Sequence, residues 1–315
     1  MEICAIASGS SGNCFYVGNK EGGLLVDAGI SSSQIVNGLN IIGKTPEDIK
    51  GILITHEHTD HIKGVDVFSR NFNVPIFATK KTANSCFLTS NLKLIKFIHN
   101  NEIFDISGME IFTFTKSHKA VDPVSFTIKN KKKVSIITDA GYSCDNILDQ
   151  ISNSDFICLE SNHDEKMLEN GKYPYFLKKW IKSNTGHLSN KQAAISVLEY
   201  AKPKLKNIIL SHLSENNNHP KVALNTFNSL LKERRDINNI LEHFKKKDKE
   251  NPIDRKKKYF FVPIKEIKEK DWDLSISKYR EIEYEEVEYE KPNVIKKKII
   301  QLEEDILKGL KNLEV

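Results

Sequence analysis

The stretch LITHEHTDH at residues 53–61 is the most informative part of this sequence. Its apolar beginning predicts a β-strand over Ile52–Thr55. His56 and His58 follow two residues apart, and on extended backbone that spacing places both imidazoles on one side of the chain. The two histidines can therefore bind one ion together.

Asp60 and His61 come next, where the chain turns into a helix predicted over Ile62–Asn71. Their side chains face a position beside the first histidine pair and can bind a second ion. Four ligand-type residues within six positions are rare in an ordinary polar loop. The motif therefore predicts a site for two metal ions.

Working outward, short β-rich runs alternate with helical stretches through residues 1–235. Besides Ile52–Thr55, the predicted strands are Glu2–Ala7, Asn13–Val17, Leu24–Asp27, Val74–Ala78, Ile111–Thr115, Ser125–Ile128, Val134–Thr138, Phe156–Glu160 and Ile208–Ser211. Besides Ile62–Asn71, the predicted helices are Tyr175–Ser183, Asn190–Tyr200, with a Ser189/Gln192 capping box, and Val222–Leu231. This mixture predicts an α/β domain.

Residues 236–315 have a different composition, with lysine runs and the acidic stretch Glu281–Glu290. Charge rises while apolar content falls, so this extension is poorly equipped to form its own core. Near its end, apolar residues recur at the spacing of one helix stripe, and such a helix usually docks on another surface. The stripe consists of Ile295, Ile299, Leu302, Ile306, Leu310 and Leu313.

Composition excludes little else. A net charge of +5 permits a polyanionic substrate without requiring one. The five cysteines are odd in number and form no CxxC, which argues for reduced thiols rather than disulfides or a zinc knuckle. Because no apolar run approaches membrane-spanning length and the first residues lack the features of a signal peptide, we expect a cytoplasmic protein without membrane contact.

The HxHxDH motif resembles that of the metallo-β-lactamase superfamily, and further segments match that family's motifs in order. They are LLVDAG with Asp27, TKSHKA with His118, IITDAG with Asp139 and IILSHLS with His212. The resemblance implies an αββα sandwich, followed here by the charged extension. It also implies that Asp27 holds the motif histidines and that Asp139 bridges two ions. One ion would be bound by His56, His58 and His118, the other by Asp60, His61 and His212.

Two cations about 3.5–4 Å apart can lower the pKa of a shared water and stabilise the oxygens of an in-line displacement. The second predicted site contains Asp60 and His212 and no cysteine, so its ligands are harder than a thiolate. The two divalent ions are therefore expected to be zinc, with manganese as the alternative.

The segments GHLSNKQAA and SHLS resemble ribonuclease Z and related nucleases. That likeness implies that His187 acts at the phosphate and that Glu160 orients it, so the predicted catalytic residues are Asp60, Glu160 and His187. The alternatives are a helix cap for His187 and a buried ion-pair partner for Glu160.

Residues 1–232, with ASGSSGN, LESNHDEKML and SHLSENNNHP, resemble the bacterial YycJ (WalJ) group most closely. This implies a metal-dependent phosphodiesterase with 5′-to-3′ exonuclease activity, on DNA rather than RNA. His163 and Asn217 are predicted to contact the substrate, with simple polar loops as the alternative. A hydrolase of the same fold acting on a thioester, lactone or cyclic phosphodiester is the second hypothesis.

Residues 237–315, which include DWDLSISKY, resemble the carboxy-terminal tail of the methylation subunit of type I restriction-modification systems. The likeness implies contact with a DNA-specificity subunit and a role as an assembly component. Methyl transfer is not expected, because no NPPF-type tetrad or glycine-rich cofactor loop is present. A solvated extension without function is the alternative.

Overall fold

The computed structural model describes residues 1–245, with side chains up to residue 232, and then residues 255, 262–270, 272, 279, 281, 296 and 301–303. Backbone contacts divide the chain into Met1–Ile237 and Asn238–Val315. This boundary falls inside the helix α9 (Pro220–Lys245). The predicted domain division between residues 235 and 236 stays a prediction.

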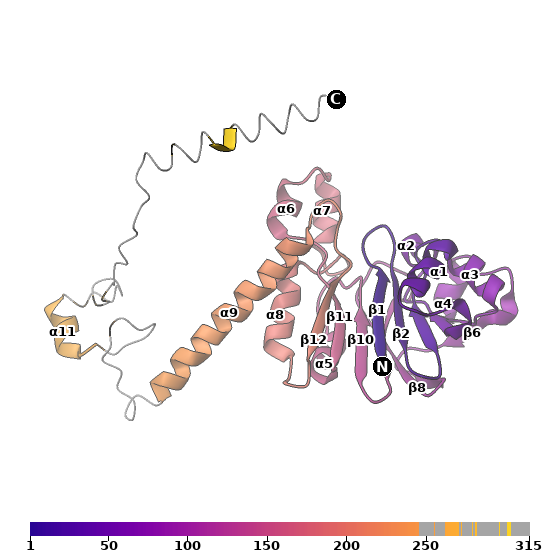
Figure 1. Cartoon of the computed structure of the whole chain (residues 1–315), viewed down its shortest axis with the longest axis horizontal. Helices are drawn as coiled ribbons and strands as arrows, with labels where there is room; N and C mark the ends of the chain where they lie inside the picture. The colour runs from indigo at the N-terminus through magenta and orange to yellow at the C-terminus, as the bar shows by residue number, and fades with distance from the viewer. Residues whose placement is uncertain are drawn as a thin grey trace. The chain divides into compact units, whose positions relative to one another are not determined.

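The first unit contains two six-stranded sheets, as far as the described residues show (Figure 1). The first sheet has the order β1 (Glu2–Ala7), β2 (Cys14–Gly18), β3 (Gly23–Val26), β4 (Ile49–Leu53), β5 (Ile76–Thr79) and β6 (Ile95–Ile98). The second has the order β12 (Asn207–Ser211), β11 (Phe156–Glu160), β10 (Lys133–Ile137), β9 (Val124–Lys129), β8 (Met109–Thr115) and β7 (Ile103–Ile106). Strands β3 to β6 run parallel, as do β10 to β12.

Helices supply the crossovers that parallel strands require. In the first half of the unit they are α1 (Ser32–Ile41), α2 (Thr59–Ile62), α3 (Val65–Phe72) and α4 (Lys80–Ser85), with 3-10 turns at Pro46–Asp48 and Leu92–Leu94. In the second half they are α5 (Asp145–Asn153), α6 (Glu165–Asn170), α7 (Tyr175–Ile181) and α8 (Asn190–Tyr200), and α9 follows the strand β12. The second unit contributes α11 (Ile264–Glu269), beside which Arg255 forms an ion pair with Glu266.

Alternating side chains on each strand build the layers. On β2, Phe15 and Val17 pack between the sheets against residues such as Ile111 and Phe126. Cys14 and Tyr16 on the same strand join the cluster that lies under α1 and α3. A third cluster joins the second sheet to α5, α8 and α9. Both sheets are therefore covered on both faces, and the predicted αββα sandwich is confirmed.

Within residues 1–245 each predicted strand and helix is found, most of them with shifted ends, but some elements were missed. They are the strands β6 and β7 and the helices α1, α4, α5 and α6. Strands β6 and β7 are four-residue edge strands, too short for an alternation to be recognised. The helix predicted over Ile62–Asn71 is two helices, because at Gly64 the chain turns sharply against the β3–α1 loop, donating its N–H to the carbonyl of Ala28 at 2.8 Å.

All five cysteines are free, in agreement with the prediction. Among the described helices, none combines the length and the apolar character needed to cross a membrane. In the apolar stripe predicted near the end of the chain, Leu302 is described and is 61 % exposed. The other members of the stripe lie outside the described residues.

Candidate metal centre

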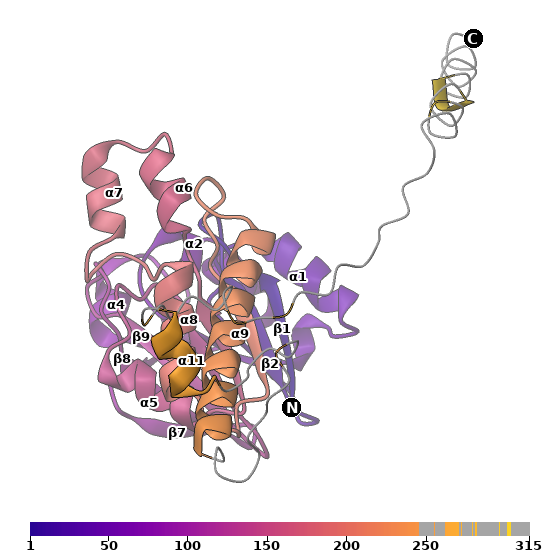
Figure 2. The ribbon, with the colours of Figure 1, turned by 90° about the vertical axis from the view of Figure 1, so that its left-hand side faces the viewer.

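The predicted ligands come from loops at one end of the sandwich, the end that carries α2 in both ribbon views (Figures 1 and 2). His56 and His58 follow β4, and Asp60 and His61 lie in α2. The second sheet delivers its residues one at a time, from the loops after β8, β10 and β12. They are His118, Asp139 and His212.

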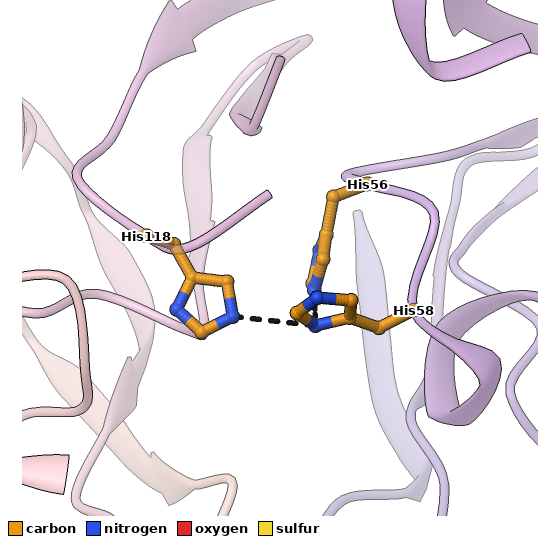
Figure 3. Close-up of side chains that lie close together, drawn as sticks. All are labelled: His56, His58 and His118. Atoms are coloured by element: carbon orange, nitrogen blue, oxygen red, sulfur yellow. Dashed lines mark hydrogen bonds between the residues drawn. The ribbon is translucent and has the colours of Figure 1, made fainter. Parts of the chain in front are cut away.

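The first donor group consists of His56, His58 and His118. The His58 Nδ1 atom lies 3.0 Å from Nε2 of His56 and 3.4 Å from Nε2 of His118. Tetrahedral zinc with Zn–N bonds of about 2.0–2.1 Å requires ligand nitrogens about 3.3 Å apart. Figure 3 shows the three rings converging from opposite loops. The separation suits three ligands of one ion.

The second donor group consists of Asp60, His61 and His212. The Asp60 Oδ2 atom lies 3.3 Å from Nε2 of His61 and 3.7 Å from Nε2 of His212. An oxygen and two nitrogens at these distances can also bind one divalent ion.

Asp139 lies between the two groups. Its Oδ2 atom is 3.0 Å from His61 Nε2, and its Oδ1 atom is 3.6 Å from His118 Nε2 and 3.5 Å from His212 Nε2. Within the described part of the chain, Asp139 Oδ2 and His212 Nε2 are buried and have no hydrogen bond of acceptable geometry. Buried polar atoms are normally satisfied. Two buried polar atoms that lie beside the other ligand atoms and lack a partner fit a pair of bound cations.

Three of the residues around this space adopt a left-handed backbone conformation one or two residues after the end of a strand. The φ angles are 59° at Asp27, 53° at Asp139 and 54° at His212. Aspartate and histidine are among the residues that enter this region several-fold more often than most non-glycine residues. The turn ends each strand and directs the side chain to the same end of the sandwich.

The sequence DAG occurs at both Asp27 and Asp139, and its glycine has the same role each time. A Cβ on Gly29 would lie 1.6 Å from the carbonyl oxygen of Asp60, and one on Gly141 would lie 2.1 Å from that of Asn184. Each turn therefore packs directly against the backbone of another loop near the site. No larger residue fits without moving that loop.

Asp27 supports the HEHTDH loop from behind. Its carboxylate accepts hydrogen bonds of 2.9 Å from the N–H and the hydroxyl of Thr55 and lies 2.7 Å from Nδ1 of His61. The Thr55 hydroxyl also lies 2.9 Å from Nδ1 of His56. Because Nδ1 of each ring is engaged in this way, Nε2 of His56 and of His61 faces the space between the predicted metal ligands.

Glu160 connects two histidines of the second half. Its Oε1 atom is 2.8 Å from Nδ1 of both His187 and His212, and its Oε2 atom accepts the N–H groups of Ala140 and Leu188. The His187 side chain is 11 % exposed, so its Nε2 edge can reach a bound molecule. One buried carboxylate thus orients a predicted metal ligand and the predicted phosphate-binding histidine together.

His187 is not the cap of helix α8, which was the alternative role for this residue. The N-cap of α8 is Ser189, which forms the expected capping box with Gln192, and His187 precedes it. The imidazole is therefore held by Glu160 rather than by free N–H groups of the helix.

The charges of the site favour cations. Burial alone would lower the pKa of His212, but Asp139, Asp60 and Glu160 raise it to about 10. Burial would likewise raise the pKa of Asp139, yet His212 and His61 hold it well below its ordinary value. The clustered carboxylates thus raise the pKa of His61 and His212 and retain protons on these two rings, and divalent cations would displace those protons on binding.

The two residues predicted to contact substrate are buried instead. The exposed fractions are 2 % for His163 and 1 % for Asn217. Burial also lowers the pKa of His163 to about 4. The backbone of Asn217 pairs with Asp164 and Ser214, which draws this loop inward. Substrate contact by these side chains stays a prediction, and their burial argues against it.

Two further polar residues near the site, Asn13 and Lys116, were not predicted from the sequence. Asn13 Nδ2 lies 3.4 Å from Asp60 Oδ2 and 3.3 Å from His61 Nε2, and the ASGSSGN segment was the available signal. Lys116 is buried and donates to the carbonyl of Thr138 at 2.6 Å. Nothing in the sequence around Lys116 distinguishes it from an ordinary exposed lysine.

An αββα sandwich with histidine and aspartate donors at one end defines the metallo-β-lactamase class of proteins. The family model of the metallo-beta-lactamase superfamily matches residues 7–90. The chain is 36 % identical to Exodeoxyribonuclease YycJ of Bacillus anthracis over 238 residues, which is 74 % of this chain and 90 % of the relative. It is 39 % identical to Exodeoxyribonuclease WalJ of Streptococcus pneumoniae serotype 2 over 226 residues, or 69 % and 83 % of the two chains. The chain belongs to the YycJ/WalJ family of the metallo-β-lactamase superfamily.

A solved structure supports the fold independently. The metallo-beta-lactamase fold protein YhfI from Bacillus subtilis superimposes with a TM-score of 0.55 at 16 % identity, covering 71 % of this chain and 92 % of that protein. At this identity the likeness concerns the fold alone.

Proposed function

We propose that this chain is a metal-dependent phosphodiesterase that degrades DNA from its 5′ ends. The observation that carries the proposal is the convergence of seven predicted donors on one buried space, in a chain whose family includes named exodeoxyribonucleases. The two other hypotheses, a small-molecule hydrolase and a pure assembly component, gain no support from these relatives.

In this proposal, His56, His58 and His118 hold one divalent ion, Asp60, His61 and His212 hold the other, and Asp139 binds both. Zinc suits this set of histidines and carboxylates best, and manganese is the alternative. When bound, such a pair lowers the pKa of a shared water and stabilises the charge that develops on phosphate oxygens.

The chain's own residues contribute orientation and a proton. Glu160 Oε1 accepts a hydrogen bond from His187 Nδ1, which fixes the ring with Nε2 facing away from the carboxylate. His187 can then donate the Nε2 proton to the leaving oxygen of the phosphodiester. Asp60 completes the second group of metal ligands. Its carboxylate also forms part of the polar surface that the substrate phosphate faces.

The test combines metal analysis with a nuclease assay on duplex DNA, single-stranded DNA and RNA, each labelled at the 5′ end. We expect two bound divalent ions and release of short labelled products from DNA. His187→Ala should retain both metals and lose most of the activity, whereas His99→Ala, which removes an exposed histidine, should retain it. A His187→Ala protein with full rate would contradict the assigned role. Turnover of thioesters or lactones without DNA cleavage would contradict the proposed substrate.

The proposal extends to a partner. Residues 237–315 would bind a DNA-specificity subunit through the tail that resembles the type I methylation subunit. Co-purification with such a subunit should be lost on truncation after residue 236. A truncated chain that still co-purifies would remove this part of the proposal.

A further inference from the structure

A pocket adjoins the candidate metal centre. It has a volume of about 440 Å³ and is lined by His58, Lys119, Phe176, Leu177 and Trp180. His58 also belongs to the first donor group, so the pocket shares a wall with that centre. A molecule bound at the metals can therefore extend into it without leaving the protein surface.

Most of the lining comes from one face of α7. Phe176 and Trp180 are four residues apart, and Leu177 and Trp180 are three apart, which places them on the same side of a helix. Helix α7 lies with α6 at the end of the unit that carries α2 (Figures 1 and 2). The aromatic face is thus held beside the loops that carry the donors.

The outer part of this face is open to solvent. Phe176 is 73 % exposed and its neighbour Tyr175 is 80 % exposed, which is unusual for adjacent large aromatic side chains. Trp180 is half-buried, and its ring centroid lies 5.4 Å from that of His187 in an edge-to-face arrangement. The pocket therefore runs from an exposed phenyl ring to an indole in contact with the predicted proton donor.

The charge of the pocket defines the chemistry of its occupant. Lys119 is exposed, follows the predicted ligand His118, and has its backbone fixed by an N–H···O bond to Thr185. An aromatic wall with one cation at its edge suits a flat π-system attached to an anion. Stacking on aromatic side chains combined with lysine at the backbone is how single-stranded nucleic acid is bound without sequence preference.

We infer that this pocket binds the nucleobase adjacent to the scissile phosphodiester. The base stacks on Phe176 and Trp180, and Lys119 contacts the neighbouring phosphate. The inference rests on the proposed function, because it assigns a subsite to the same substrate. It predicts tolerance of any base, since each base has a face that can stack and the pocket offers few hydrogen-bonding groups.

The deciding variant is Phe176→Ala in the full chain. Truncation of a side chain that is 73 % exposed leaves the core intact. We expect KM for 5′-labelled single-stranded DNA to rise about 10-fold, within the range for one stacked base, with kcat and metal content unchanged. Phe176→Trp should restore KM. Phe97→Ala removes a phenyl that is 54 % exposed on β6 and should have no effect.

The substrate offers a matching change. An abasic site at the terminal nucleotide should raise the KM of the wild-type protein as much as Phe176→Ala does. The same abasic substrate should cause no further rise in the KM of the variant. An unchanged KM in Phe176→Ala, or an equal abasic penalty in both proteins, would overturn the subsite.

A binding measurement separates this inference from the proposed function. Fluorescence anisotropy with a phosphorothioate oligonucleotide reports base-dependent binding without turnover. Base-dependent binding that is lost in Phe176→Ala, with no cleavage of ordinary DNA, would retain the subsite and remove the proposed function. Cleavage of DNA with equal binding by the wild type and Phe176→Ala would do the reverse.

Discussion

The two halves of the sandwich contribute to the candidate centre in different ways. The half that ends at β6 supplies its donors from one loop, His56 to His61. The half that begins at β7 supplies His118, Asp139 and His212 from three loops that are far apart in the sequence. The second set meets because β8, β10 and β12 run in the same direction in one sheet. Strands β8 and β10 are both antiparallel to β9, and β10 to β12 are parallel, so all three strands end at one edge.

The difference shows that a fold can bring ligands together from separate loops as well as a contiguous sequence motif can. A contiguous loop keeps its ligands together by chain connectivity, whereas separated ligands depend on sheet register and on turns that allow close packing. Both halves nevertheless use the same DAG turn, with Gly29 and Gly141 against opposing backbone. We therefore expect the scattered ligands to matter as much as the contiguous ones.

The largest expected effect tests that equality directly. His58→Ala and His118→Ala should each lower the phosphodiesterase rate by about 10³-fold or more, because each removes a predicted ligand of the same ion. Metal content and initial rates are the measurements, with His99→Ala as the matched control. Prolonged dialysis against a chelator should abolish activity, and added zinc should restore it in the wild type. A His118→Ala protein with normal metal content and rate would contradict the expectation that the scattered ligands matter as much as the contiguous ones.

The close packing of the two DAG turns predicts the next effect. Gly29→Ala and Gly141→Ala should each lower the free energy of unfolding by about 3 kcal/mol, because the added methyl overlaps opposing backbone. Urea unfolding provides the measurement. At Gly43 no atom lies within 4 Å of the added methyl, so Gly43→Ala should cost only the strain of a positive φ, about 1 kcal/mol. If Gly29→Ala and Gly141→Ala lower the free energy of unfolding no more than Gly43→Ala does, the two turns can relax to accept the added methyl.

The carboxylates behind the histidines give a smaller effect. Asp27→Asn in the first half and Glu160→Gln in the second should each lower the rate by about 10–100-fold, since each amide orients its histidines less well than a carboxylate does. Steady-state kinetics and metal affinity are the readouts. Glu110→Gln, which removes an exposed partner of Lys129, should leave both unchanged. A loss confined to Asp27→Asn would mean that His187 and His212 do not need Glu160.

The smallest effect concerns stability and pH. Burial lowers the pKa of His163 from 6.5 to about 4, so between these values the unfolded chain binds more protons than the folded one. Stability should therefore fall as the pH drops through this window, by about 1 kcal/mol at about pH 5.5, and His163 should contribute no slope above its ordinary pKa. Comparing urea unfolding of the metal-free wild type with His163→Gln isolates this contribution. Identical pH slopes in the two proteins would contradict it.

The fold class could be predicted because its signals are local. Alternating apolar residues on strands such as Phe156–Glu160, and the HEHTDH loop, depend on a few consecutive residues. The edge strands β6 and β7 were not predicted, because four residues are too few to show the alternation of apolar and polar side chains that identifies a strand. His163 and Asn217 were predicted to contact the substrate from their positions in polar segments, but tertiary packing buries both side chains.

The amino-acid sequence alone predicts which residues can bind a metal and in which order they occur along the chain. Only the tertiary structure decided that one oxygen of Glu160 is shared by His187 and His212, and that the aromatic face of α7 adjoins His58. The physical reason is that periodicity and motifs record neighbours along the chain. Contacts between separate loops depend instead on sheet register and on how closely two backbones can approach.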